Sequence, residues 1–407
     1  MTRVEEHLGT NQPAGSPPEP IEDLIPEVRQ RARRRRLKNL AIVVLAAALV
    51  ASLIAITDSG SPATHRPGGA PSPSSLASTL ANGSTVVPNQ PVSLAVGPNG
   101  ELYVADIGRE QILRRSPNGR FVVVAGTGIA GYTGDGRLAT RAELDGPGSL
   151  AIAPNGALYF AQTGQTRTSS GLMNSVVREV APNGKITTVI GQDPNCALVP
   201  SNSISVPAQL AEFSGASLTV GSGGLLDVST TVCPNVLHLG GFLQLTSSGK
   251  LVQTSVDAIP KTSGYCGGGI AGPGFIAFGC SSGSGRGPRL MVVRSNGSTE
   301  NYPDTTSQPN DMSASNGTVV AIHNGAIVRV GVNGLATIAT QRQLANLVPG
   351  ATGGWPGVGI AIDRHGTVYV DQDFLFDRRG CADVIFEIGP SGQVRNLWHS
   401  ALTRSCY

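Results

Sequence analysis

The sequence predicts an all-β protein whose main domain is a six-bladed β-propeller. Gly (53 residues) and Pro (28 residues) make up about a fifth of the 407 residues, and both are poor in helix interiors. Short apolar runs alternate with Gly-containing turns along most of the chain, a pattern typical of many short strands. The turns recur at intervals near the roughly 40–50 residues of a propeller blade.

Two repeat units show the pattern most clearly, at residues 92–126 and 148–191. Each unit has four apolar runs, and Pro-Asn-Gly joins the first run to the second and the third to the fourth. Asn-Gly is a strong hairpin signal because both central residues of a type I′ turn need positive φ. Each unit therefore predicts a four-stranded antiparallel meander with two such turns.

The same two turns can be followed along the chain. The second turn recurs at Asn118-Gly119, Asn183-Gly184, Ser248-Gly249, Asn296-Gly297, Asn333-Gly334 and Ser391-Gly392. The first turn recurs at Asn99-Gly100, Asn155-Gly156, Asn316-Gly317 and His365-Gly366, and in weaker form at Gly223-Gly224 and Pro273-Gly274. One four-stranded sheet cannot bury both of its faces, whereas six sheets arranged radially bury each face against a neighbour.

Two stretches resemble a known family. LYVADIGREQILRRSPNGRFVVVAGTG (102–128) is similar to an NHL repeat, and residues 128–161 are similar to the Gly-Asp-Gly linker that joins NHL blades in bacterial proteins. The resemblance is weaker over 215–340 and returns at 357–398. It implies a six-bladed propeller over residues 88–407. It implies no single function, because such propellers serve as protein-binding domains, sensor ectodomains, lactonases and lyases.

The segment before the propeller predicts a membrane anchor. Residues 1–39 form a polar tail with a cluster of basic residues between Arg29 and Lys38, and an apolar run follows from Leu40 to Ile56. That run is about 25 Å long as a helix, at the short end of what spans a bilayer. Basic residues before the run predict a cytoplasmic tail, a single-pass signal anchor at residues 40–57 and an extracytoplasmic C-terminal domain.

The tail and the linker complete this topology. The basic cluster is expected to contact anionic lipid. Residues 58–87 are rich in Ser, Pro and Gly and predict a flexible linker. A cleaved signal peptide is the alternative, but the long polar segment and the sequence Ile56-Thr57-Asp58 fit it less well.

The cysteines indicate disulfides. All six lie beyond the apolar run, at Cys196, Cys233, Cys266, Cys280, Cys381 and Cys406. An even number in an oxidising compartment favours up to three bridges, and the absence of a C-x-x-C pair disfavours zinc. Many connectivities are open. Sequential pairing closes the shortest loops and favours Cys196–Cys233, Cys266–Cys280 and Cys381–Cys406.

A metal in the central channel is the site that a propeller enzyme would need. The residues expected to end the second strand of each unit are Asp106, Gln162, Ser229, Cys280, His323 and Gln372. This set does not supply the six to eight oxygens that calcium prefers. No cofactor is therefore predicted. Calcium is a candidate cofactor only under the alternative that the protein is an enzyme.

Several side chains have two interpretations. Asp106, His323, Asp371 and Asp373 are weak metal candidates, and Asp371, Asp373, Asp377 and Asp383 form the best acidic patch. Solvation on a loop is the favoured interpretation of that patch. Asp106 and Asp135 are expected to stabilise turns through their carboxylates.

These observations favour a binding or sensing module over an enzyme. The loops at 127–147, 192–214 and 371–383 are expected to form a recognition surface for an envelope protein or polymer. Its expected apolar anchors are Tyr132, Phe213, Phe374 and Phe376. The net charge of +3 is too small to indicate a nucleic-acid binder. A metal-dependent lactonase- or lyase-type enzyme that uses the channel is the alternative.

Overall fold

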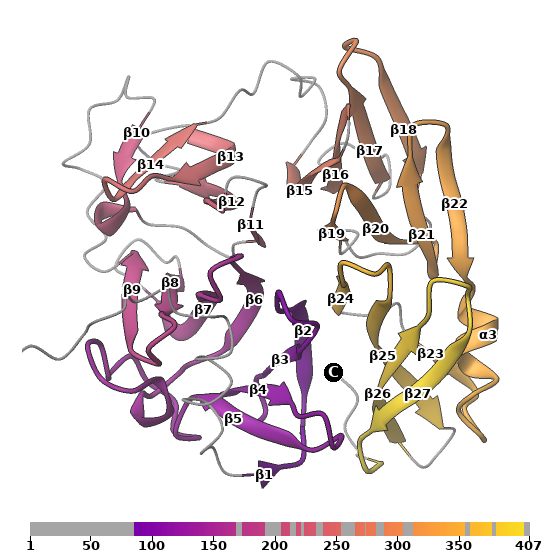
Figure 1. Cartoon of the computed structure of the whole chain (residues 1–407), viewed down its shortest axis with the longest axis horizontal. Helices are drawn as coiled ribbons and strands as arrows, with labels where there is room; N and C mark the ends of the chain where they lie inside the picture. The colour runs from indigo at the N-terminus through magenta and orange to yellow at the C-terminus, as the bar shows by residue number, and fades with distance from the viewer. Residues whose placement is uncertain are drawn as a thin grey trace, which may run out of the picture. The chain divides into compact units, whose positions relative to one another are not determined.

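Six antiparallel sheets stand around a common axis in the computed structural model (Figure 1). The structure describes residues 85–167, 173–191, 205–211, 217–220, 224–232, 239–253, 265–272, 274–281, 289–303, 312–354, 359–376 and 380–402. Each sheet is one blade built from consecutive strands, so the predicted six-bladed propeller is confirmed.

The first two blades match the two clearest repeats. Blade 1 contains β2 (Pro91–Val96), β3 (Leu102–Asp106), β4 (Gln111–Arg115) and β5 (Phe121–Ala125), with β1 (Thr85–Val86) on its outer edge beside β5. Blade 2 contains β6 (Pro147–Ile152), β7 (Leu158–Arg167), β8 (Met173–Val180) and β9 (Ile186–Ile190). Because β1 pairs with β5, the propeller begins at Thr85, inside the segment expected to be linker.

The two middle blades correspond to the weaker repeats. Blade 3 contains β11 (Ser217–Val220), β12 (Leu226–Val232), β13 (Leu239–Leu245) and β14 (Lys250–Gln253), with β10 (Ser205–Pro207) on the outer edge. Blade 4 contains β15 (Tyr265–Gly272), β16 (Phe275–Ser281), β17 (Arg289–Arg294) and β18 (Thr299–Pro303).

The last two blades end the ring. Blade 5 contains β19 (Met312–Ser315), β20 (Thr318–His323), β21 (Ala326–Gly331) and β22 (Gly334–Ala339). Blade 6 contains β24 (Gly359–Ile362), β25 (Val368–Phe376), β26 (Gly380–Ile388) and β27 (Val394–His399), with β23 (Gly353–Gly354) beside β25. A short helix, α3 (Gln341–Ala345), follows blade 5, and a capping box between Thr340 and Gln343 begins it.

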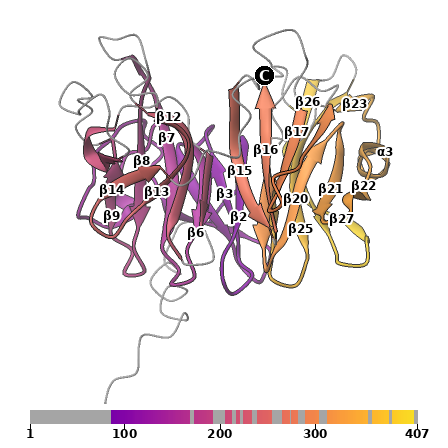
Figure 2. The same ribbon diagram turned by 90° about the horizontal axis from the view of Figure 1, so that it is seen from above.

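The innermost strands form a closed ring. In chain order they are β2, β6, β11, β15, β19 and β24, and each contacts the innermost strands of the two neighbouring blades. Figure 1 shows these six strands nearest the axis, and Figure 2, turned by 90°, shows strands running along it. Among the described residues, blades 1 and 6 share no strand. The ring therefore closes through side-chain packing between its first and last blades, and we call this interface the closing seam.

The predicted turns occur, but most are not of the predicted type. Gly100, at the first turn of blade 1, has a φ of 86°, and glycines at the equivalent turns also have positive φ. Pro98 precedes Asn99 in this turn, and its ring fixes φ near −65°. A type I′ turn is excluded there because it needs positive φ at that position. In the described part of the chain, only Asn316 among the predicted turn asparagines has positive φ.

Alternation along the strands divides the core into layers between blades. On β3, Tyr103 and Ala105 belong to the apolar cluster shared with blade 2. Leu102 and Val104 point the other way and belong to the cluster shared with blade 6. Both faces of this sheet are thus buried at β3, which explains why four of the five residues of β3 are apolar.

The segment expected to be a loop at residues 371–383 consists mostly of strand. β25 and β26 form a long hairpin in which Asp373 stands directly opposite Asp383. Alternating apolar residues on both strands pack against blade 5, which accounts for the extension of the hairpin. The prediction that these acids lie on a solvated loop is therefore corrected for Asp371 and Asp383, both of which are buried.

Two groups of predictions fall mainly outside the described residues. The anchor at residues 40–57 lies there, and within the described ranges no helix is long and apolar enough to cross a membrane. Cys196, Cys233 and Cys406 also lie there. Cys381 is buried and disulfide-bonded. The backbones of Cys266 and Cys280 stand opposite each other in β15 and β16. The connectivity stays a prediction.

Candidate ligand channel and the acids of the closing seam

The innermost strands surround a channel of about 880 Å³. Its wall carries hydroxyl groups among aliphatic side chains. Five serines from four of the innermost strands are among the described residues that line it: Ser93 of β2, Ser149 of β6, Ser217 of β11, and Ser313 and Ser315 of β19. The channel wall is therefore polar without being strongly charged.

Three of these serines join neighbouring blades. The backbone N–H of Leu150 donates to Ser93 Oγ at 3.2 Å, and that of Leu218 donates to Ser149 Oγ at 2.9 Å. The backbone N–H of Ile362 donates to Ser313 Oγ at 3.3 Å. The inner edge of each blade leaves N–H groups without a strand partner, and the serines satisfy them. Each hydroxyl oxygen accepts in this contact, so its own hydrogen stays available to donate.

Calcium does not fit the described wall of this channel. A calcium ion takes six to eight oxygens at about 2.3–2.6 Å, with carboxylates prominent among them. Asp227 is the one carboxylate among the described residues that line the channel, and it accepts a hydrogen bond from Gln244 Nε2 at 2.9 Å. Nor does the described part of the chain place any group of three or more His, Cys, Asp or Glu side chains to hold a metal ion.

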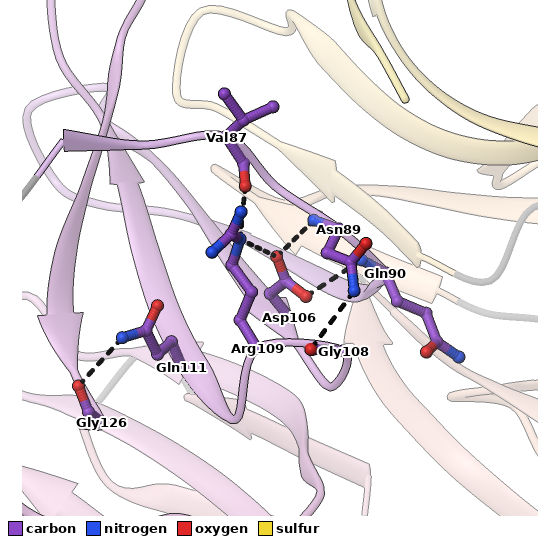
Figure 3. Close-up of polar contacts among 8 residues, drawn as sticks. All are labelled: Val87, Asn89, Gln90, Asp106, Gly108, Arg109, Gln111 and Gly126. Carbon is purple, nitrogen blue, oxygen red and sulfur yellow. Dashed lines mark hydrogen bonds and ion pairs between the residues drawn. The ribbon is translucent and has the colours of Figure 1, made fainter. Parts of the chain in front are cut away.

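Asp106 holds the segment that enters blade 1 (Figure 3). Its carboxylate accepts backbone hydrogen bonds from Asn89 at 2.7 Å and from Gln90 at 3.0 Å. Arg109 Nε lies 3.8 Å from Asp106 Oδ2 and also donates to the carbonyl of Val87. The expected structural role is observed: the carboxylate binds the segment before β2 and also interacts with the backbone of Arg109 in the turn after β3.

The acids of blade 6 face the same region. Tyr369 of β25 packs in the closing seam, and Asp371 and Asp373 follow it at intervals of two, on the same face of the strand. Asp383 of β26 lies opposite Asp373. On β3, Asp106 follows Leu102 and Val104 at the same interval and so faces blade 6. Four carboxylates therefore gather at one end of the closing seam.

Burial changes the protonation of this group. Burial raises the pKa of Asp371 well above its usual value, and the charges of Asp383, Asp373 and Asp106 raise it further. Burial, followed by a hydrogen bond and charge repulsion from Asp373, raises the pKa of Asp383 to about 8. Burial also raises the pKa of Asp106, against the opposing effect of its backbone hydrogen bonds. Neither carboxylate oxygen of Asp371 makes a hydrogen bond of normal geometry with the residues that the structure describes.

The Gly-Asp-Gly linker between blades 1 and 2 is fixed by a buried arginine. Arg178 of β8 is fully buried and donates to Asp135 Oδ1 at 2.6 Å and to the carbonyl of Thr133 at 3.0 Å. The backbone N–H of Thr188 donates to Asp135 Oδ2 at 2.9 Å. These contacts lower the pKa of Asp135 despite the opposing effect of burial. The predicted structural role of Asp135 is confirmed.

The expected aromatic anchors do not form one surface. Phe374 and Phe376 are buried in the cluster between blades 5 and 6, and the Phe374 ring packs edge-on against Phe386 at 5.8 Å. Neither can be a surface anchor, because alternation along β25 turns both toward the core. Tyr132 is 36% exposed and stays a candidate. Phe213 lies outside the described residues.

The weak metal candidates are not brought together as a set. His323 ends β20 in blade 5, where its ring packs edge-on near Tyr302 at 6.3 Å. Asp106, Asp371 and Asp373 meet in the closing seam instead. Sequence reasoning missed the serines of the channel. A Ser-Leu pair that recurs at Ser93, Ser149 and Ser217 could have indicated them.

Comparison with known proteins adds distant similarities. No protein-family model matches the chain. A segment of 111 residues, 26% of this chain, is 33% identical to Teneurin-m of Drosophila melanogaster and covers 4% of that protein. The chain therefore spans a small fraction of the length of this relative.

Solved structures with similar folds include three propeller enzymes. Virginiamycin B lyase from Staphylococcus aureus is 11% identical, covers 78% of this chain and 99% of its own, and has a TM-score of 0.41. Aldose sugar dehydrogenase from Streptomyces coelicolor is 15% identical, with coverages of 71% and 90% and a TM-score of 0.40. A gluconolactonase from Xanthomonas campestris is 11% identical, with coverages of 84% and 88% and a TM-score of 0.34. These similarities are too distant to bear on chemistry.

Proposed function

We propose that this protein is a membrane-anchored, extracytoplasmic propeller that binds an uncharged, oxygen-rich ligand, such as one strand of an envelope polymer, in its central channel. The observation that carries the proposal is the set of channel serines. Ser93, Ser149 and Ser313 each use their oxygen to accept a backbone hydrogen bond, which leaves a donor hydrogen for a ligand acceptor.

The composition of the channel wall supports an uncharged ligand. Asp227 is the one charged side chain among the described lining residues, and a charged ligand group would lose water without gaining a salt-bridge partner of opposite sign on most of the wall. Hydroxyl and ether oxygens are desolvated at lower cost, and serine donors can replace the water that they lose. The rigid ring lowers the entropy cost of binding because the donors are already in position.

The location is proposed from the sequence. The basic cluster before Leu40–Ile56 supports a cytoplasmic tail at anionic lipid and a single span, and the Pro- and Ser-rich residues 58–87 support a tether. A tethered propeller would search the space near the membrane for a polymer or envelope protein. Tyr132 is kept as a contact residue outside the channel.

Binding of neutral oligosaccharides to the full-length protein tests this function. Isothermal titration calorimetry with the wild type should give measurable affinity. Replacing Ser93 and Ser149 together by Ala should weaken it about thirtyfold, since each lost hydrogen bond contributes about 1 kcal/mol. Ser248→Ala is the matched control, because Ser248 lies on an exposed turn of blade 3. Equal affinity in the double variant and the wild type, with both folded by circular dichroism, would contradict the proposal.

The alternative is a metal-dependent lactonase- or lyase-type enzyme. It would be supported by turnover of a lactone that stops on chelation while the circular dichroism spectrum is unchanged. That result would replace the binding proposal. The binding proposal is preferred because the described channel wall does not offer calcium its ligands.

A further inference from the structure

The closing seam differs from the other blade interfaces because it joins two blades that are not consecutive in the sequence. Consecutive blades are joined directly by the polypeptide, whereas blades 1 and 6 lie at opposite ends of the propeller sequence. Phe121 of blade 1 and Trp398 of blade 6 pack edge-on across the seam at 6.5 Å, within an apolar cluster that includes Val104 and Ile385. Non-covalent contacts in this cluster hold the described part of the seam together.

The apolar contact gives way to carboxylates at one end. Asp106 of β3 faces blade 6, while Asp371 and Asp373 of β25 and Asp383 of β26 face blade 1, as the alternation of each strand requires. Asp371 is fully buried, and neither of its oxygens makes a hydrogen bond of normal geometry within the described part of the chain. The backbone N–H of Gln372 interacts with it, and its effect on the pKa of Asp371 is smaller than those of burial and of the neighbouring acids.

Among the described residues, the charged and titratable groups near this end also include Arg109, which lies beside Asp106 and is 35% exposed, and Glu110, whose pKa the charge of Asp106 helps to raise. His399 of β27 stands opposite Val384, the residue that follows Asp383.

Four carboxylates beside one guanidinium cannot all be ionised there at low cost. An ionised carboxylate that is buried without a partner loses its hydration and gains nothing in return. Asp373 and Asp383 stand directly opposite each other, so their charges repel at close range. Protonation removes both penalties and lets one carboxyl of the pair donate to the other.

We propose that the closing seam is a proton-dependent latch, in which protonated carboxyls hold blades 1 and 6 together and their ionisation loosens the ring at this interface. The proposal does not depend on what the channel binds. It gives the ring one preferred place to open.

The direction of the pH effect follows from the protonation of the folded state. Burial raises the pKa of Asp383 to about 8 and that of Asp371 well above its usual value, so the closed seam binds more protons than the open one. Raising the pH above the ordinary aspartate pKa of about 4 therefore lowers the stability of the closed seam, and the loss ends once the highest group has ionised. The seam is most stable in acid and least stable in mildly alkaline solution.

Trp398 reports on the seam directly. The chain has two tryptophans, so the full-length protein with Trp355→Phe keeps Trp398 as its single indole fluorophore. Emission should move to longer wavelength as the pH rises from about 5 to 9, because an open seam exposes the indole to water. Asp383→Asn should move the midpoint by about one pH unit or more, and Asp371→Asn should reduce the amplitude, because each removes a titrating group.

The controls distinguish the latch from a general pH response and from a metal site. Asp227→Asn makes the same change at a half-buried carboxyl of blade 3 and should leave the midpoint in place. If Asp371→Asn does not fold, Asp383→Asn and Asp373→Asn still test the proposal. A pH-independent Trp398 signal in the folded wild type would overturn it. A second result would also overturn the proposal: a chelator shifts the pH midpoint of the wild type but not that of Asp371→Asn. The acids would then hold a metal ion.

Discussion

Two interfaces between neighbouring blades differ in whether a buried charged group has a partner. They are the interface between blades 1 and 2 and the closing seam between blades 6 and 1. In the first interface, Asp135 is paired with the buried Arg178. In the closing seam, Asp371 is buried and makes no hydrogen bond of normal geometry with the described residues. The strand pairing shows that Asp371 of blade 6 is equivalent to Ala105 of blade 1. Asp371 pairs with Gly359, and Ala105 pairs with Ser93 at the corresponding place. The carboxyl therefore occupies a position where blade 1 has a methyl group.

This difference shows how a repeat fold can make one interface conditional. A paired buried charge stays compensated by its partner over the whole pH range in which both groups are ionised. An unpaired buried carboxyl contributes only while it is protonated. The same ring can therefore contain interfaces that are fixed and one whose strength depends on pH.

The largest effect is expected at the fixed interface. Asp135→Ala leaves the guanidinium of Arg178 buried without its carboxylate and should lower the free energy of unfolding by about 3 kcal/mol, the lower end for a broken buried pair because Asp135 is partly exposed. Urea denaturation at pH 7 measures this change. Arg395→Ala, which removes an exposed guanidinium from its ion pair with Glu387, is the control and should cost much less. Similar losses in the two variants would contradict the role of Arg178.

The closing seam should respond in the opposite direction. Asp371→Ala copies the residue of blade 1 and removes an unpartnered buried carboxyl, so it should raise the free energy of unfolding at pH 8 by about 1–2 kcal/mol. At pH 4 the carboxyl is already protonated, and the gain should largely disappear. Urea denaturation at both pH values tests this. A destabilised variant at pH 8 would show that the carboxyl has a favourable partner.

The smallest effect is expected at the channel wall. Ser149→Ala removes the acceptor for the backbone N–H of Leu218, and the loss should be about 1 kcal/mol at any pH between 5 and 8. The thermal unfolding midpoint measures it, with the exposed Ser248→Ala as the control. No difference between the two variants would mean that water replaces the serine as acceptor.

The fold was predictable because its signals are local. Hairpin turns with Gly100 and Gly119 recur along the chain, and each repeat predicts its own strands. The turn type was predicted wrongly. The prediction of a type I′ turn considered only the Asn-Gly pair, whereas the preceding Pro98 excludes the positive φ that this turn type needs at that position. The length of β25 and β26 was also missed, because the acids at Asp371 and Asp383 interrupt an apolar pattern that continues on the other face of the hairpin.

The candidate sites were predicted less well because they depend on contacts between blades. Phe374 looked like a surface anchor, and only its neighbours across the hairpin show that it is core. Asp106 and Asp371 are far apart in the sequence and meet only when the ring closes. The Ser-Leu pairs of the innermost strands recur visibly, but their hydrogen bonds lie between blades and cannot be inferred from one repeat.

Hydrogen exchange of the innermost strands tests the central claim most directly. Amides of β2 and β24, which meet at the closing seam, should exchange faster at pH 8 than at pH 5 after correction for the intrinsic pH dependence of exchange, whereas amides of β6 and β11 should keep their protection. Asp371→Ala should reduce this difference, because Asp383 still titrates in this variant. Equal changes in protection at every blade interface would contradict the account, because the pH response would then belong to the whole ring and not to the seam.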